Sequence, residues 1–212
     1  MCLSRSIRDA RTGVSTRHFE KWEPQLAKTL LYSASLARWL GLRYRHWALG
    51  RRPRTIAEVH SWAMANMRRR RYCVVVTVSD GVASARVVEP FHPDRDGVIR
   101  FGTDPRSRKV RDMVESGTCL LVYEDDRRRS CVSVECSASI EPQMSRPWFK
   151  AAWSAFWPEG PGEDYAVIRC VPRAMEVWAG LAVIAPAPFG RRSVRLERRD
   201  GEWVAPEFPT AG

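Results

Sequence analysis

The sequence predicts an α+β protein built mainly on an antiparallel β-barrel. Many short runs rich in β-branched and aromatic residues follow one another, and two or three helical patterns are inserted between them. Most of the runs are joined by tight turns. The clearest turns are Asp80-Gly81 and Asp200-Gly201, because Asp-Gly between two such runs is the strongest short hairpin signal.

Length and composition limit the possible classes of protein. The 212 residues suit one domain, or one domain with an appendage, and can bury a core without disulfides. The six cysteines form no CxxC pair and have no histidines at ligand spacing, so we expect reduced, buried thiols rather than a disulfide framework or a metal site. No apolar run approaches the roughly 18–20 residues that span a bilayer, which predicts a soluble, cytoplasmic protein.

The first 54 residues form a basic N-terminal arm. The formal charge of +11 is concentrated in Met1–Arg71, which holds 16 Lys/Arg and 4 Asp/Glu. A helix is predicted over Pro24–Leu40, and the preceding residues suit a disordered arm or an organellar transit peptide. The arm's charge and its aromatic residues allow binding to nucleic acid or an anionic membrane. Helical spacing among leucines favours packing of these aromatics instead.

A second region, residues 55–212, begins with a helix. Thr55 and Glu58 have the spacing of a capping box, and an apolar stripe follows them. The stripe consists of Ile56, Val59, Trp62 or Ala63, and Met67. Arg68–Arg71 comes at the C-terminal end of this helix, where cations suit the helix dipole. We interpret the four arginines as a solvated helix end, with a phosphate-binding patch as the alternative.

The strands are expected in a regular succession. The run Tyr72–Pro90 contains a hairpin whose second strand places Ser84 and Arg86 on one face and Val87 on the other. Later strands are predicted at Val98–Thr103, Thr118–Tyr123, Ser130–Ile140, Tyr165–Pro172, Ala174–Trp178 and in a last hairpin, Ser193–Val204.

The stretch FGTDPRSRKVRDM combines a helix start with cations. Asp104 is predicted as the N-cap and Pro105 as the first helical residue, so that Ser107, Arg108 and Lys109 fall in the first turn. Free backbone N–H groups, the helix dipole, a hydroxyl and two cations would then meet at one place. Such a turn suits a phosphate monoester, although basic first turns are often only solvated surface.

Four motifs occur here in a familiar order: VTVSDGVASARVVEP, VIRFGTDPRSRKVRDM, VSVECSASI and MEVWAG. The order and spacing resemble the FMN-binding split barrels of the pyridoxamine 5′-phosphate oxidase superfamily. Within it, the chain is most similar to the general stress protein branch. The resemblance covers about Thr55 to Trp178 and implies a six-stranded split barrel that forms a homodimer, with FMN between the subunits.

The resemblance also implies the cofactor-binding residues. Arg86 and Val87 would meet the isoalloxazine and ribityl region, with Thr103 and Asp104 near the phosphate. Ser107, Arg108 and Lys109 match the phosphate grip of the family. Trp178 would wall the flavin from the second subunit, with a core tryptophan as the alternative.

The sequence differs from the vitamin B6 enzyme of this superfamily at positions of its substrate-binding motifs, so we do not expect pyridoxamine phosphate to be the substrate. Pro90 and Phe91 stand where that enzyme has a lysine after its strand arginine, and Ser145-Arg146-Pro147 matches only part of its substrate region. We find no catalytic residues or metal ligands, and FMN would supply the redox chemistry.

We therefore expect an oxidoreductase that passes electrons from NAD(P)H to an unidentified acceptor. The alternatives are a non-catalytic flavin-binding stress or sensor protein, a deazaflavin or haem ligand, and nucleic-acid or membrane binding through the arm.

Overall fold

The computed structural model describes residues 34, 36–44, 46–47, 55–141, 146–180 and 193–206, and the chain divides into two compact units, residues 1–47 and 48–212. In the first unit the described residues are helical. The helix predicted over Pro24–Leu40 is confirmed for residues 34 and 36–40, and the rest of it lies outside the described residues. No helix in the described part of the chain has both the length and the apolar composition to cross a bilayer.

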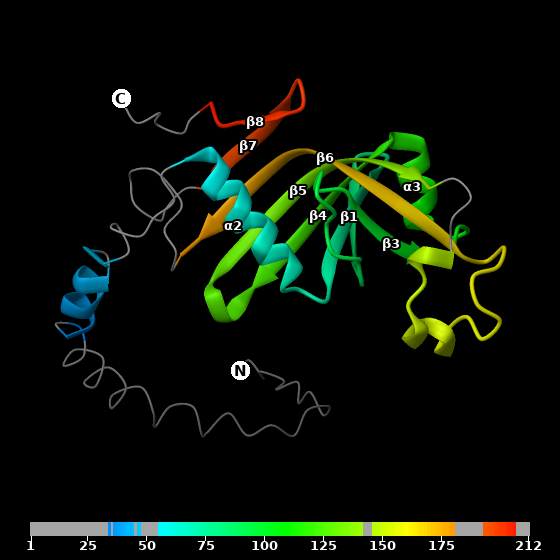
Figure 1. The fold of residues 1–212 in the computed structure, drawn as a ribbon, viewed down its shortest axis with the longest axis horizontal. Helices are drawn as coiled ribbons and strands as arrows, with labels where there is room; N and C mark the ends of the chain where they lie inside the picture. The colour runs from blue at the N-terminus through cyan, green and yellow to red at the C-terminus, as the bar shows by residue number, and fades with distance from the viewer. Residues whose placement is uncertain are drawn as a thin grey trace, which may run out of the picture. The chain divides into compact units, whose positions relative to one another are not determined.

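The second unit begins with α2, Ile56–Arg68, which lies across one face of the sheet (Figure 1). The predicted capping box is present: Glu58 N–H donates to Thr55 Oγ1 at 3.2 Å, and Thr55 N–H donates to Glu58 Oε2 at 3.1 Å. Val59, Ala63 and Met67 are buried, as the apolar stripe predicts. The local sequence therefore fixes both the start of α2 and the side that packs on the sheet.

The sheet has eight strands, and three hairpins join six of them in pairs. β1 (Cys73–Ser79) pairs antiparallel with β2 (Val82–Val88) around Asp80 and Gly81, which both have positive φ. β4 (Thr118–Asp125) and β5 (Ser130–Ile140) form the second hairpin across a short 3₁₀ segment, η2 (Asp126–Arg128). β7 (Val194–Arg199) and β8 (Glu202–Val204) form the third around Asp200-Gly201.

One long strand, β6 (Ala166–Ala179), organises the rest of the sheet (Figure 1). One of its edges pairs with β5. The other pairs first with β3 (Ile99–Thr103) and then with β7, so the order is β2-β1-β4-β5-β6-β7-β8 with β3 on β6. Among the residues that the structure describes, one isolated bridge, between Pro90 and Phe101, connects the end of β2 to β3. The sheet is consistent with a split barrel and is not closed.

The structure corrects the prediction in two places. The six strands implied by the resemblance are too few, because the β7–β8 hairpin belongs to the same sheet and brings the number to eight. The runs Tyr165–Pro172 and Ala174–Trp178, predicted as separate strands, form one strand, β6. Its pairing register with β5 shifts between Glu135 and Cys136. The aromatic run WFKAAWSAFW, which the resemblance to the general stress protein branch implies is a Trp-rich helix, is instead part of two 3₁₀ segments, η3 (Arg146–Trp148) and η4 (Ala151–Ala155). The aromatic side chains of this run pack into one cluster, in which Phe149 lies edge-on to Trp153 and Trp153 is tilted against Tyr165.

The main core lies between α2, α3 (Arg108–Ser116) and the sheet, and it includes buried Val75, Leu121, Tyr123 and Met175. A second cluster gathers Trp153, Tyr165 and Val167 with the neighbouring aromatic side chains. All five described cysteines are free, and four of them are buried, as expected of reduced thiols in a core.

Candidate functional site

The first turn of α3 begins later than predicted. Ser107 is the N-cap and Arg108 the first helical residue, so the assignment of Asp104 as N-cap and Pro105 as first helical residue is wrong. Asp104 instead accepts a hydrogen bond from Arg106 N–H at 2.8 Å and pairs with the Arg106 guanidinium at 2.9 Å. These hydrogen bonds lower the pKa of Asp104 to about 2. The Asp104 carboxylate thus completes a local turn before the helix.

The Ser107 hydroxyl has no partner. An N-cap oxygen ordinarily accepts a hydrogen bond from a backbone N–H two or three residues later. Here the Ser107 side chain makes no such bond, and its buried Oγ has no hydrogen-bond partner among the residues that the structure describes. The first N–H groups of a helix also lack partners within the helix. The start of α3 therefore combines an unsatisfied hydroxyl with the positive end of a helix dipole.

Lys109 adds an uncompensated cation to this helix start. It forms no ion pair with any residue that the structure describes. Burial of the Lys109 amine, followed by the charge of Arg86, lowers its pKa, while Asp104 acts in the opposite direction. Two neighbouring cations in a partly buried place would be stabilised by an anion.

A buried network holds Arg86 in position. Its Nη1 donates to Thr77 Oγ1 at 2.9 Å, and its Nη2 lies 3.7 Å from Asp112 Oδ2. Thr77 in turn donates to the same Asp112 oxygen at 2.6 Å, and both Thr77 and Asp112 are buried. Arg108 extends away from the helix start and donates to Ser84 Oγ at 2.9 Å. Arg86 is thus oriented by β1 and α3 without occupying its full set of donors.

A cavity of about 410 Å³ opens beside the start of α3. We call it the α3 cavity. It is lined by Val87, Val88, Glu89, Gly102, Thr103, Lys109, Trp153, Phe156 and Trp157. Small-molecule sites occupy roughly 300–1,000 Å³ and combine apolar walls with a few polar groups, and the α3 cavity fits both criteria.

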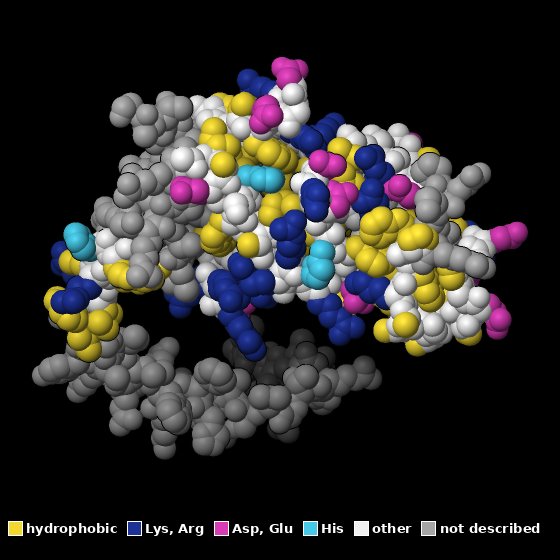
Figure 2. Space-filling model, in the orientation of Figure 1, with side chains coloured by type: hydrophobic (Ala, Val, Ile, Leu, Met, Phe, Trp, Pro, Cys, Tyr) yellow, Lys and Arg dark blue, Asp and Glu magenta, His cyan; other side chains and the backbone are white. Residues whose placement is uncertain are grey.

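Close packing shapes the aromatic wall. A side chain at Gly102 would overlap the ring of Tyr165, so glycine allows Tyr165 to lie directly against β3. Tyr165 packs edge-on against Trp157 with ring centroids 5.1 Å apart. Apolar side chains gather over the η3–η4 region on the face shown in Figure 2. Trp153 and Tyr165 are buried, whereas Phe156 is 75% exposed, so the wall combines a buried base with an exposed edge.

The structure brings together most, but not all, of the predicted site residues. Val87, Thr103 and Lys109 line the α3 cavity, and Ser107 and Arg86 adjoin Lys109. Trp178 does not lie there. Thr103 pairs with Ala166 at the start of β6, whereas Trp178 lies near its end, roughly 40 Å away at about 3.3 Å per residue. Its contribution from a second subunit stays a prediction.

The sequence interpretation missed Asp112 and the aromatic wall as site residues. Asp112 is an acidic residue four positions after Arg108 in a basic helix, a spacing that could have indicated a local ion pair. Trp153, Phe156 and Trp157 were visible as an unusually aromatic run, but the 3₁₀ geometry that turns them toward β3 has no clear sequence signal. Among the described residues, no group of histidine, cysteine or acidic side chains could hold a metal ion.

No protein-family model matches the sequence, and no curated protein matches it significantly. Solved structures do match. An FMN-binding protein from Nostoc punctiforme, related to pyridoxamine 5′-phosphate oxidase, has 17% identity and a TM-score of 0.51, over 70% of this chain and 93% of its own. A protein from Clostridium acetobutylicum related to general stress protein 26 has 12% identity and a TM-score of 0.53, over 66% and 92%.

A third match has an organic acid bound. PhzG from Burkholderia lata, in complex with tetrahydrophenazine-1-carboxylic acid, has 20% identity and a TM-score of 0.50, over 72% of this chain and 91% of its own. Sequence identities this low support a shared fold and do not establish a shared activity. The resemblance seen in the sequence motifs is confirmed at that level: this chain has the fold of the split-barrel proteins related to pyridoxamine 5′-phosphate oxidase and general stress protein 26.

Proposed function

We propose that this protein binds FMN in the α3 cavity, with the phosphate at the start of α3. The observation that carries the proposal is the buried Ser107 hydroxyl, which has no partner and lies at a helix N-terminus next to the unpaired cation Lys109. A phosphate monoester would satisfy the hydroxyl and the first N–H groups of α3 while neutralising Lys109. The FMN-binding relative of the same fold supports the choice of cofactor.

The remaining residues suit the other parts of FMN. Arg86, fixed by Thr77 and Asp112, offers a planar donor group for flavin carbonyl oxygens or phosphate. Val87 and Trp153 offer apolar surface for the ring system. Arg108 and Asp104 would act at the edge of the site, since their side chains bond to Ser84 and Arg106.

The bound flavin would supply two-electron redox chemistry, and the protein would orient it and limit access of water. We propose that the holoprotein passes electrons from NAD(P)H to an acceptor. Steady NAD(P)H oxidation in the presence of an artificial acceptor would support this role. Flavin binding without turnover would instead support a reservoir or sensor.

We also propose a homodimer that completes the site. Val82 and Val87 on β2 and Val114 on α3 are each at least 60% exposed, although one of them, Val87, lines the α3 cavity. Val82 and Val87 lie on opposite faces of β2, which stands at the end of the strand order, so a second subunit that packed along this strand could bring its Trp178 to the flavin. We expect sedimentation to show a dimer for the native chain and a monomer for Val82→Asp. A native chain that sediments as a monomer at micromolar concentration would contradict the proposal.

Titration of the flavin-free protein with FMN tests the central part of the proposal. FMN fluorescence should change on binding, with a dissociation constant in the micromolar range or below, because three or four charge-assisted hydrogen bonds contribute about 1.5–3 kcal/mol each before the cost of immobilising the ligand. A protein that neither carries FMN nor takes it up would refute the assignment.

A further inference from the structure

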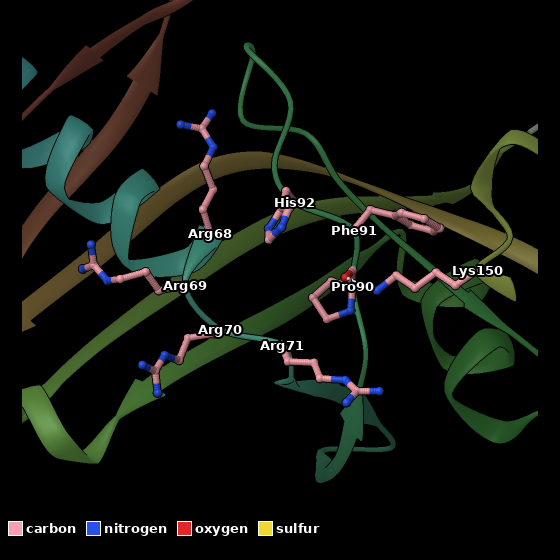
Figure 3. A pocket seen from close by; sticks show the side chains of 8 residues that line it. All are labelled: Arg68, Arg69, Arg70, Arg71, Pro90, Phe91, His92 and Lys150. Carbon is pink, nitrogen blue, oxygen red and sulfur yellow. Dashed lines mark hydrogen bonds between the residues drawn. The ribbon is translucent and has the colours of Figure 1, made fainter. Parts of the chain in front are cut away.

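A second cavity, of about 310 Å³, lies beyond the C-terminal end of α2. We call it the arginine cavity. Its lining consists of Arg68, Arg69, Arg70, Arg71, Pro90, Phe91, His92 and Lys150. Figure 3 shows the four arginine side chains spread around the end of α2 and Lys150 approaching Pro90 from the η3–η4 side. None of these residues lines the α3 cavity.

Positive charge in the arginine cavity is only partly compensated. Arg70 pairs with Asp125 at 2.7 Å, and Arg71 and Lys150 share one oxygen of Glu89, each at 3.2 Å. Arg68 donates to the carbonyl oxygen of Pro93, and neither Arg68 nor Arg69 has an ion pair within the described part of the chain. Five cations therefore face two carboxylates. A band of Lys and Arg side chains is visible on this face in Figure 2.

Several of the cations are fixed in place. The Lys150 amine donates to the Pro90 carbonyl oxygen at 3.0 Å and lies over the rings of Phe91 and Trp153, at 5.0 and 5.1 Å from their centroids. Arg70 Nε is buried and has no hydrogen-bond partner in the described part of the chain. An unsatisfied buried donor beside excess positive charge favours an anionic ligand over water alone.

We propose that the arginine cavity binds a phosphorylated small molecule with at least two negative charges. Arginine forks match phosphate oxygens in geometry, and the cavity is at the lower end of the roughly 300–1,000 Å³ of small-molecule sites. The cations come from α2, from its connection to β1 and from Lys150 just before η4, so segments far apart in the sequence line one cavity. A nucleic-acid strand would need open aromatic faces, whereas the Phe91 ring packs against Trp148 and Trp153.

Calorimetric titration of the full chain with inorganic pyrophosphate tests the proposal. In Arg68→Gln/Arg69→Gln, pyrophosphate should bind at least tenfold more weakly, since both side chains are exposed and the fold should be retained. The matched control is Arg111→Gln/Arg127→Gln, which removes the same charge from exposed positions outside both cavities. We expect less than a twofold change for this control.

Three results would overturn the proposal: no pyrophosphate binding by the native chain, equal weakening in both double variants, or tighter binding of a single-stranded oligonucleotide that only the Arg68/Arg69 variant loses. The variant Lys109→Met distinguishes pyrophosphate binding in the arginine cavity from binding in the α3 cavity. Pyrophosphate binding should persist in Lys109→Met, and its loss there would assign the ligand to the α3 cavity instead. The proposal does not depend on FMN, so a failed FMN titration leaves this experiment interpretable.

Discussion

Replacing Lys109 by methionine isolates the electrostatic contribution of the α3 helix start. Methionine keeps an unbranched apolar stem and removes the charge. If the Lys109 amine forms one charge-assisted hydrogen bond to the FMN phosphate, its loss costs about 1.5–3 kcal/mol. At about 1.4 kcal/mol per tenfold change, FMN should bind roughly 10- to 150-fold more weakly. The protein itself should lose no stability, because Lys109 is partly buried beside the like charge of Arg86.

The assay compares FMN with riboflavin, which lacks the phosphate. Lys109→Met should weaken FMN binding and leave riboflavin binding nearly unchanged, as measured by flavin fluorescence. Arg111→Met on the same helix is the control, since Arg111 is exposed and does not line the α3 cavity. Equal loss of FMN and riboflavin affinity would refute a phosphate contact at Lys109, and so would an unchanged FMN affinity.

Three further predictions concern the support of the site. Asp112→Ala should destabilise the protein by about 3–5 kcal/mol in urea unfolding, because it leaves the Thr77 hydroxyl without its buried acceptor and Arg86 without its ion-pair partner; an unchanged midpoint would contradict this. Gly102→Ala should lower the melting temperature and weaken FMN binding, because its side chain overlaps the Tyr165 ring and overpacking costs about 1–3 kcal/mol. A native-like melting temperature would argue against this close packing. Glu89→Gln should reduce stability at pH 7 but not in acid: burial opposes ionisation of Glu89, yet hydrogen bonds from Trp153 and Lys150 and the Lys150 charge keep its pKa below the usual value. The stabilisation from Glu89 is therefore present above the unfolded pKa of about 4.3 and is lost as pH falls through the folded pKa, so the two stability curves should converge in acid and not stay parallel.

Local signals predicted most of the fold. Asp80-Gly81 and Asp200-Gly201 set two hairpins, and the pairing of Thr55 with Glu58 set the start of α2, because each depends on neighbouring residues alone. The continuity of β6 could not be predicted, since it depends on which strands lie along its two edges. The 3₁₀ segments near Trp153 depend in the same way on packing against distant Tyr165.

The candidate site was predictable to a similar extent. Ser107 and Lys109 were found from the motif at the start of α3, but the register of that helix was wrong by several residues because Asp104 bonds to Arg106. The support of Arg86 by Asp112 is a tertiary contact, and the sequence alone gave no reason to pair these residues. The proposed role of Trp178 could not be tested in one chain, since it requires a second subunit.

The visible absorbance spectrum of the purified protein, with mass spectrometry of whatever heat releases from it, tests the central claim most directly. We expect a yellow protein with two flavin absorbance bands that releases FMN on heating. A colourless protein that also fails to take up added FMN would contradict it.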